Sequence, residues 1–403
     1  TLALLRHARD ASINALSFPY GGFRRGQREI AELVYKCVDQ RGQLLLEAPT
    51  GIGKTAAVLF PALKALAKGK HDRVIFLTCK SIGRRAAQDA LADFAEAGYR
   101  GASLSLTARE KICFSPGRAC HGDDCPYARN YYDKLPLAMQ AAIEQGVLRR
   151  ADIEALARRF EVCPYELTLD LLPWVDVIIA DLHYVYSLSA RLGNAMETDG
   201  SRWTVLLDEA HNLPGRARDM YSATLAKATV LQVRSTVSGE LGKCLTRINH
   251  QLLALQNRPW NETDFDTSEN LPLALLDATQ RFALAVSEQL AWEPFLLQRR
   301  PLLMEFYFQV LQFLRVAEQW GDDYRAQLTR DTGRQSLCVT LNCLDPARLL
   351  AARHTSAHAV IAFSATLSPL PWARASLGLQ EQAVCLRARS PFASDQLQVW
   401  LAT

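Results

Sequence analysis

Residues 48–55 hold the residue types that bind a nucleoside triphosphate, in the order Ala-Pro-Thr-Gly-Ile-Gly-Lys-Thr. Gly51 and Gly53 let backbone N–H groups turn toward phosphate oxygens. Lys54 supplies a positive charge to the β- and γ-phosphates, and the Thr55 hydroxyl can ligate Mg²⁺. A chance glycine-rich turn is the alternative, but an expected strand before the loop and a helix after it argue against one. The expected nucleotide contacts are Pro49, Thr50, Gly51, Gly53, Lys54 and Thr55.

A second stretch, Asp208-Glu209-Ala210-His211, ends an apolar run with two carboxylates. Asp208 can hold Mg²⁺ through water, and Glu209 can orient or deprotonate an attacking water. We expect His211 to link this site to neighbouring motifs. Alone, the two acids could be a solvated strand end. Together with the loop at Lys54 they predict a hydrolase that uses ATP and Mg²⁺.

Four cysteines lie between these stretches, separated by six, four and thirty-seven residues. Zinc sites usually show paired short knuckles, and only Cys120 and Cys125 are close here. Cys125 and Cys163 each precede a proline, as some iron–sulfur ligands do. We therefore predict a [4Fe–4S] cluster, with zinc or unligated thiols as alternatives. The predicted ligands are Cys113, Cys120, Cys125 and Cys163.

Composition excludes several classes of protein. The 403 residues are 49% hydrophobic, enough for two or three packed domains rather than a disordered chain. The net charge of +4 requires any nucleic-acid surface to be a local stripe. We find no apolar run of the roughly 18 residues that a membrane span needs, and no signal peptide. We expect an intracellular, cytoplasmic protein, and the missing initial Met suggests a trimmed chain.

Short apolar runs that alternate with helical stretches predict a doubly wound α/β sheet. Two long segments interrupt it, at about 110–170 and about 215–353. The first contains a helical part at 137–160. The second reads as mostly α-helical, with a polar loop at 257–270 and no strand before about Ser336. The expected strands are 43–47, 74–78, 102–106, 175–180, 204–207 and 359–363.

Further motifs follow in a fixed order: Val74–Thr78, Leu106–Cys113, Cys163–Leu167, Asp176–Tyr184 and Ser364-Ala365-Thr366-Leu367. Taken alone, the motif at Ser364 would be read as a simple turn. With the phosphate loop and the Asp208 box, the series resembles the XPD/DinG family of iron–sulfur, superfamily 2 DNA helicases across nearly the whole chain.

The resemblance implies a RecA-like parallel sheet with an inserted iron–sulfur domain and an inserted, mostly α-helical arch domain. Its implied divisions are motor domain one at 1–109, the iron–sulfur domain at 110–170, the DEAH part of the motor at 171–214, the arch at 215–353 and the last motor part at 354–403.

The resemblance also implies ATP-dependent 5′→3′ unwinding of single-stranded or junction DNA, in a DNA-repair setting on the bacterial nucleoid. It makes Gln27, with Arg24, the adenine-reading residues, and a surface capping segment is the alternative. A positively lined groove with a few aromatics suffices for single strands, although each residue alone could be solvated surface. The candidate DNA contacts are Lys80, Ser81, Arg84 and Arg85 in one group, and Arg109, Lys111, Arg118, Tyr127, Arg129, Tyr131 and Tyr132 in another.

The resemblance ends after Ser390-Pro391-Phe392, and no Gln-x-x-Gly-Arg-x-x-Arg motif follows. Because an arginine finger is worth roughly 10³–10⁵ in rate, we expect this N-terminal fragment to hydrolyse little ATP and not to unwind. Two other readings stay open. One is a non-motor module that binds single-stranded DNA or a protein, and the other is a helicase accessory to a nuclease.

Overall fold

The computed structural model describes residues 2–260, 264–331 and 336–390. The chain divides into two compact units, Thr1–Leu213 with Ala347–Thr403, and Pro214–Pro346. Residues 110–170 lie within the first unit rather than forming a unit of their own. Pro391 and Phe392, where the family resemblance ends, lie outside the described residues.

The first unit is built on a parallel sheet of eight strands in the order β12-β1-β11-β6-β2-β5-β3-β4. This confirms the predicted α/β fold. The central strands are buried on both faces, and such strands read as continuous apolar runs in a sequence. The strands are β1 (Gln43–Glu47), β2 (Arg73–Leu77), β3 (Ser103–Ser105), β4 (Val147–Leu148), β5 (Val177–Ala180), β6 (Trp203–Asp208), β11 (Ala359–Ser364) and β12 (Val384–Arg387).

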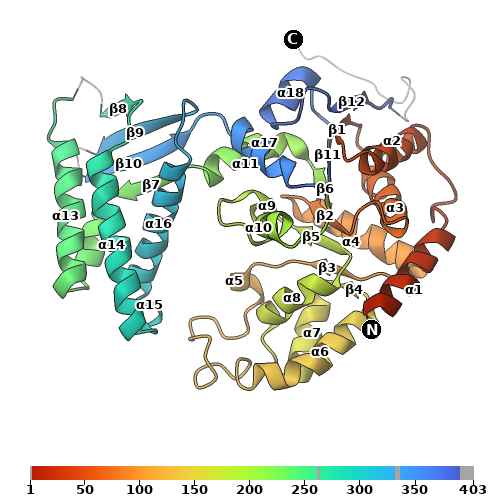
Figure 1. The fold of residues 1–403 in the computed structure, drawn as a ribbon, viewed down its shortest axis with the longest axis horizontal. Coiled ribbons are helices and arrows are strands. Elements are labelled where there is room, and N and C mark those ends of the chain that lie inside the picture. Colours follow the sequence, from red (N-terminus) through yellow and green to blue (C-terminus); the bar gives the residue numbers. More distant parts are fainter. Residues whose placement is uncertain (1, 261–263, 332–335, 391–403) are drawn as a thin grey trace, which may run out of the picture. The chain divides into compact units, whose positions relative to one another are not determined.

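Helices cover both faces of this sheet (Figure 1). Those on one face, α1 to α4, share a core with the strands in which Ile30, Leu59, Phe76 and Phe363 are fully buried. The helices of the unit are α1 (Leu2–Ala15), α2 (Gln27–Asp39), α3 (Lys54–Ala67), α4 (Ser81–Glu96), α5 (Arg109–Ile112), α6 (Tyr131–Gln145), α7 (Arg150–Phe160), α8 (Pro164–Leu171), α9 (His183–Tyr186), α10 (Arg191–Thr198), α17 (Ala347–Thr355) and α18 (Leu370–Ser376).

The predicted helical stretch 137–160 is wrong as one continuous element. Helix α6 ends at Gln145, and the next residue, Gly146, has a φ of 79° that is readily adopted only by glycine. The next two residues form β4, which pairs with β3 at the edge of the sheet, before α7 begins. The helical periodicity on either side concealed this two-residue strand.

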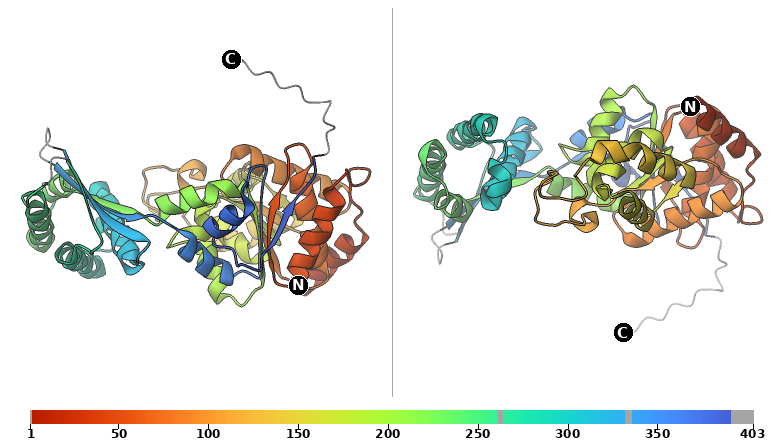
Figure 2. Two further views of the ribbon diagram at one scale, coloured as in Figure 1. Left: turned by 90° about the horizontal axis from the view of Figure 1, so that it is seen from above. Right: turned by 90° about the horizontal axis from the view of Figure 1, so that it is seen from below.

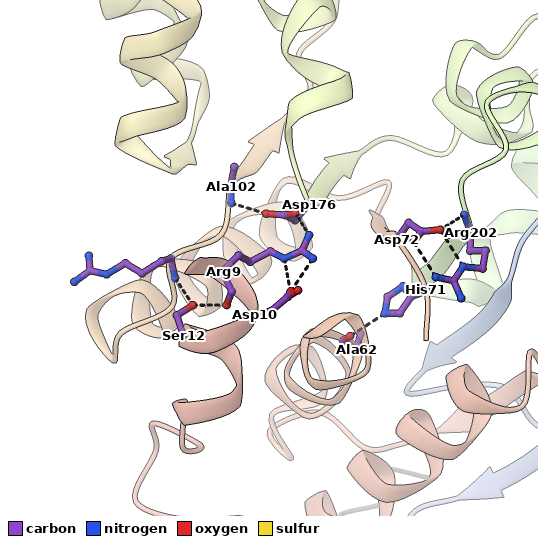
Figure 3. A network of polar contacts seen from close by, with 10 residues as sticks. Arg9, Asp10, Ser12, Ala62, His71, Asp72, Ala102, Asp176 and Arg202 are labelled. Atoms are coloured by element: carbon purple, nitrogen blue, oxygen red, sulfur yellow. Dashed lines mark hydrogen bonds and ion pairs between the residues drawn. The ribbon is translucent and has the colours of Figure 1, made fainter. Parts of the chain in front are cut away.

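Ion pairs tie the amino ends of the strands together, at the edge opposite the one that carries the motifs (Figure 3). Arg9 of α1 pairs with Asp176, and Asp176 also accepts a hydrogen bond of 2.9 Å from the Ala102 amide. Arg202 pairs with Asp72 at 2.9 Å. Hydrogen bonds from Arg202 lower the pKa of Asp72 to about 2. These contacts join α1 and the starts of β2, β5 and β6.

The second unit contains an antiparallel sheet of four strands in the order β7-β10-β9-β8. Its helices lie beside this sheet (Figure 2), and the side chains of β10 alternate between buried and half-buried. The strands are β7 (Ala223–Ala226), β8 (Phe265–Ser268), β9 (Tyr324–Asp331) and β10 (Ser336–Cys343). The helices are α11 (Leu213–Met220), α12 (Lys227–Arg234), α13 (Gly239–Gln256), α14 (Leu273–Trp292), α15 (Leu296–Arg299) and α16 (Pro301–Glu318).

The expectation of no strand before Ser336 is therefore wrong. Strands β7, β8 and β9 precede it, and β8 lies within the stretch expected to be a polar loop. A signal for β9 was present, since Tyr324, Ala326 and Leu328 are buried and alternate with polar residues. Residues 347–353, expected within the second insertion, belong to the first unit as part of helix α17. Among the described residues, no helix has the length and apolar composition required to cross a membrane.

Candidate functional site

Four neighbouring strands bring the sequence motifs to one edge of the sheet. Strands β1, β11, β6 and β2 are adjacent and parallel, so their carboxyl ends lie side by side. Glu47 is in register with Ser364, and Phe363 with Asp208. Ligand sites of open α/β sheets form outside the carboxyl ends of strands, and the phosphate loop, the Asp208 box and Ser364 all lie there.

The phosphate loop has the backbone that its glycines require. Gly51 and Gly53 have φ of 82° and 80°, and α3 begins directly after Gly53. The Lys54 Nζ donates to the carbonyl oxygens of Ala48 at 3.0 Å and Pro49 at 3.2 Å. Burial lowers the pKa of Lys54, and the charges of Glu209 and Asp208 oppose that shift. The lysine therefore lies within electrostatic reach of both carboxylates.

Gln27 packs against the phosphate loop rather than on the surface. Its Oε1 accepts a hydrogen bond of 2.7 Å from the Arg24 amide, and its Nε2 lies 3.5 Å from the Gly53 carbonyl oxygen. A Cβ at Gly53 would come within 2.4 Å of that nitrogen. Arg24 donates to the Gly51 carbonyl oxygen at 2.9 Å. Both residues therefore support the phosphate loop. This supporting role was not among the roles expected from the sequence, which were base reading and capping.

Asp208 is held in a buried position at the end of β6, with only 7% of its surface exposed. Its Oδ2 lies 3.3 Å from the Thr78 hydroxyl at the end of β2. Burial, followed by the neighbouring Glu209 charge, raises the pKa of Asp208 to about 6. A buried carboxylate of this kind gains from a bound cation, which suits the predicted magnesium ligand.

Glu209 and His211 follow in a tight turn. Glu209 has a φ of 50°, an uncommon conformation for a residue with a side chain, and begins a short 3-10 helix at Ala210–Asn212. The His211 Nδ1 lies 2.6 Å from the Ser364 hydroxyl oxygen and 3.5 Å from Glu209 Oε2. The structure thus joins the Asp208 box to the end of β11.

Two further residues lie at this edge of the sheet that the sequence analysis did not identify as site residues. Thr78 contacts Asp208, and Gly83 of α4 packs so closely that a Cβ there would lie 2.4 Å from both the Thr78 hydroxyl and Asp208 Oδ2. A polar residue at the end of β2 was a signal for Thr78. Nothing in the sequence distinguished Gly83 from an ordinary helical glycine.

The four spaced cysteines line one cavity of about 340 Å³. It lies between the loops that follow α5 and the start of α8. The guanidinium of Arg109 donates to Cys120 Sγ at 2.9 Å, and the Ser115 amide lies 3.4 Å from Cys113 Sγ. Burial raises the pKa of Cys163, while the backbone N–H groups of Glu166 and Tyr165 at the start of α8 oppose the shift. These donors favour thiolates, the form in which cysteine binds metals.

Within the described residues, no three histidine, cysteine, aspartate or glutamate side chains are close enough to hold a single metal ion. The cysteines surround a space instead of converging on a point. A four-iron cluster is larger than one ion and takes one thiolate at each iron, so the donor set and the cavity fit such a group. Cys37 differs, because it is buried in the core and burial raises its pKa to about 12.

The predicted DNA contacts are only partly available. Arg84 donates to the Leu106 carbonyl oxygen at 2.9 Å, and Tyr131 is buried with its hydroxyl 2.7 Å from Asp170 Oδ2. Tyr132, by contrast, is 80% exposed at the rim of the cysteine cavity. Lys80 and Arg85 are exposed at the start of α4.

Two protein families match parts of this chain. Residues 24–106 match the DEAD/DEAH box helicase family, and residues 96–230 match DEAD_2. The chain is 22% identical over 271 residues to "Fanconi anemia group J protein homolog" of Gallus gallus, covering 56% of this chain and 21% of that protein. It is 20% identical over 224 residues to "General transcription and DNA repair factor IIH helicase subunit XPD" of Dictyostelium discoideum, covering 49% and 29% respectively. It thus spans less than a third of either relative.

A solved structure named "Truncated XPD" has the same fold, with a TM-score of 0.56 at 18% identity over 88% of this chain and 98% of that one. The family matches cover the phosphate loop, the four cysteines and the Asp208 box, and the shared fold extends the likeness to the rest of the chain. The chain thus carries a DEAD/DEAH-box helicase domain over residues 24–106 and a DEAD_2 domain over residues 96–230, on the fold of the solved XPD structure.

Proposed function

We propose that this chain carries the ATP-hydrolysing part of a DNA helicase or translocase that moves 5′→3′ along single-stranded or junction DNA. The observation that carries the proposal is the meeting of the phosphate loop, Asp208 and Ser364 at the ends of adjacent strands. DNA as the substrate and the polarity come from the family resemblance.

The residues at this edge divide the work of hydrolysis. Backbone N–H groups between Gly51 and Thr55 and the start of α3 cradle the phosphates, and Lys54 exchanges its two loop carbonyls for phosphate oxygens. The Thr55 hydroxyl and Asp208 would hold Mg²⁺, which neutralises phosphate charge when it is bound. Glu209 orients the attacking water, and the contact between His211 and Ser364 links this site to β11.

We further propose that residues 110–170 hold a [4Fe–4S] cluster through Cys113, Cys120, Cys125 and Cys163. The cavity that the four cysteines share, with no three of the described ligand side chains close enough for a single ion, supports this assignment over zinc. The hydrogen-bond donors toward two of the sulfur atoms support their binding as thiolates. The cluster would act mainly as a structural support, since this segment buries few apolar side chains between α5 and α6. In the same way, Pro214–Pro346 would correspond to the arch domain of the family.

ATP hydrolysis by the natural full-length protein, with and without single-stranded DNA, tests the motor. Single-stranded DNA should stimulate hydrolysis strongly, and Lys54→Ala should abolish it while the protein stays folded. Hydrolysis that is absent or indifferent to DNA would favour a non-motor binding module instead. Iron and acid-labile sulfide contents test the cluster separately, and a zinc-loaded, colourless protein would contradict it.

A further inference from the structure

Lys80 is a candidate DNA contact that forms an ion pair with Glu209. It follows β2 and precedes α4, and its Nζ lies 3.6 Å from Glu209 Oε2. The lysine side chain is 54% exposed, whereas that of Glu209 is 23% exposed. One end of this ion pair therefore faces solvent, and the other belongs to the proposed water-orienting residue.

The turn that carries Lys80 is held firmly against the site. Gly83, in the first turn of α4, leaves no space for a Cβ against Asp208 and Thr78, with both contacts at 2.4 Å. The Lys80 amide also lies 3.4 Å from the Thr78 hydroxyl. Because the backbone is packed in this way, Lys80 can change partner by side-chain rotation alone, without movement of α4.

Glu209 has two ion-pair partners in the part of the chain that the structure describes, Lys80 and His211. The His211 Nδ1 is also 2.6 Å from the Ser364 hydroxyl oxygen, a shorter contact than its 3.5 Å to Glu209. Lys80 is thus the partner of Glu209 with a permanent charge. Because its side chain is exposed, a ligand arriving from solvent can draw it away from Glu209.

A lysine ammonium is a compact charge that a carboxylate and a phosphate compete for. We propose that Lys80 couples nucleic-acid occupancy to hydrolysis: without a phosphate backbone it pairs with Glu209 and holds that carboxylate away from its water, and a bound phosphate draws it off. This inference rests on the proposed function. A half-exposed pair is weak, which suits a contact that must exchange.

A binding measurement on this chain tests the pairing without any need for hydrolysis. Glu209→Gln should raise the affinity for a single-stranded oligonucleotide about two- to fivefold at low salt, since an exposed pair is worth that much. In a Lys80→Ala background the gain should disappear. Glu32→Gln, which removes the carboxylate of the exposed Arg28–Glu32 pair, controls for the change in net charge. An equal gain in both backgrounds, or no gain in either, would overturn the inference.

Hydrolysis by the natural full-length protein gives a second readout. Lys80→Ala should raise the DNA-free rate about two- to fivefold and remove most of the stimulation by DNA. Lys68→Ala, at an exposed lysine after α3, should change neither. A DNA-free rate that is unchanged or lower in Lys80→Ala would contradict the pairing. If the wild-type protein hydrolysed no ATP, the proposed function would fail, and the binding measurement would still decide the role of Lys80.

Discussion

The His211 ring nitrogen Nδ1 lies 2.6 Å from the Ser364 hydroxyl oxygen, although 152 residues separate the two in the sequence. Ser364 is fully buried at the end of β11, and His211 follows β6, its neighbour in the sheet. The contact can exist only because these strands are parallel and adjacent. It is therefore the most direct link between the Asp208 box and a motif far along the chain.

Ser364→Ala should uncouple that link while leaving nucleotide binding intact. We expect the DNA-stimulated kcat of the natural protein to fall about tenfold, because the loss of one polar partner costs about 1.4 kcal/mol. The KM for ATP should stay within about twofold, since Ser364 contacts the phosphate loop through its backbone oxygen, which accepts from the Ala48 amide and is kept in the variant. Ser376→Ala, in α18, is the control. A parallel change in kcat and KM would mean that Ser364 acts on nucleotide binding.

Gly83→Ala should disturb Asp208, the carboxylate that we propose holds Mg²⁺. The new Cβ would lie 2.4 Å from Asp208 Oδ2 and from the Thr78 hydroxyl, so one of these groups must move. We expect a loss of about 2 kcal/mol in the free energy of unfolding, together with weaker Mg²⁺-dependent nucleotide binding. Gly215→Ala, in α11, meets nothing within 4 Å and should be neutral or slightly stabilising. Equal stability of the two variants would rule out the close approach.

Cys163→Ser should remove iron from the protein, and Cys244→Ser should not. Cys163 lines the cysteine cavity, whereas Cys244 is a buried residue of α13 in the second unit. We expect the Cys163 variant to lose its visible absorbance and most of its iron and sulfide, and to be more sensitive to proteolysis between residues 110 and 170. Full retention of iron in that variant would exclude Cys163 as a ligand.

Asp176→Ala should be markedly destabilising. It leaves the buried Arg9 guanidinium without its main partner and removes the acceptor of the Ala102 amide (Figure 3). Breaking such a pair costs about 3 kcal/mol in the free energy of unfolding, measurable by urea titration. Asp10→Ala removes the more exposed partner of Arg9 and should cost less than about 1 kcal/mol. Similar costs for both variants would show that Asp176 has no special role.

Stability should fall as the pH drops below neutrality, because of His354. This residue is buried beside the Tyr186 hydroxyl, and burial lowers its pKa to about 4. Since the unfolded chain takes up a proton near pH 6.5 and the folded state does not, stability is lost as the pH falls from about 6.5 toward 4. We expect a loss of about 2 kcal/mol between pH 7 and pH 5 from this group. His354→Gln should make the free energy of unfolding less dependent on pH in that range. An unchanged pH dependence would mean that other groups cause it.

The sequence by itself predicted the chemistry of the site and determined most strands of the first unit. The phosphate loop, the Asp208 box and six of the eight strands of the parallel sheet were readable, because a strand buried on both faces is a continuous apolar run. The edge strands β4 and β12 were not expected from the sequence. The small strands of the second unit were harder to read. Strand β8 alternates between exposed and half-buried positions, and β7 is only four residues long. Neither strand therefore shows the clear alternation of apolar and polar residues by which a strand is recognised in a sequence.

Only the tertiary structure decided which residues meet. The gathering of four cysteines around one cavity, the Thr78–Asp208 contact and the position of Gly83 all depend on the strand order β11-β6-β2-β5-β3 and on the loops that follow those strands. Local sequence carries no information on strand order, since the parallel pairs are joined by crossovers and inserted segments. For the same reason the sequence did not show that Lys80, a candidate DNA contact, lies beside Glu209 in the fold.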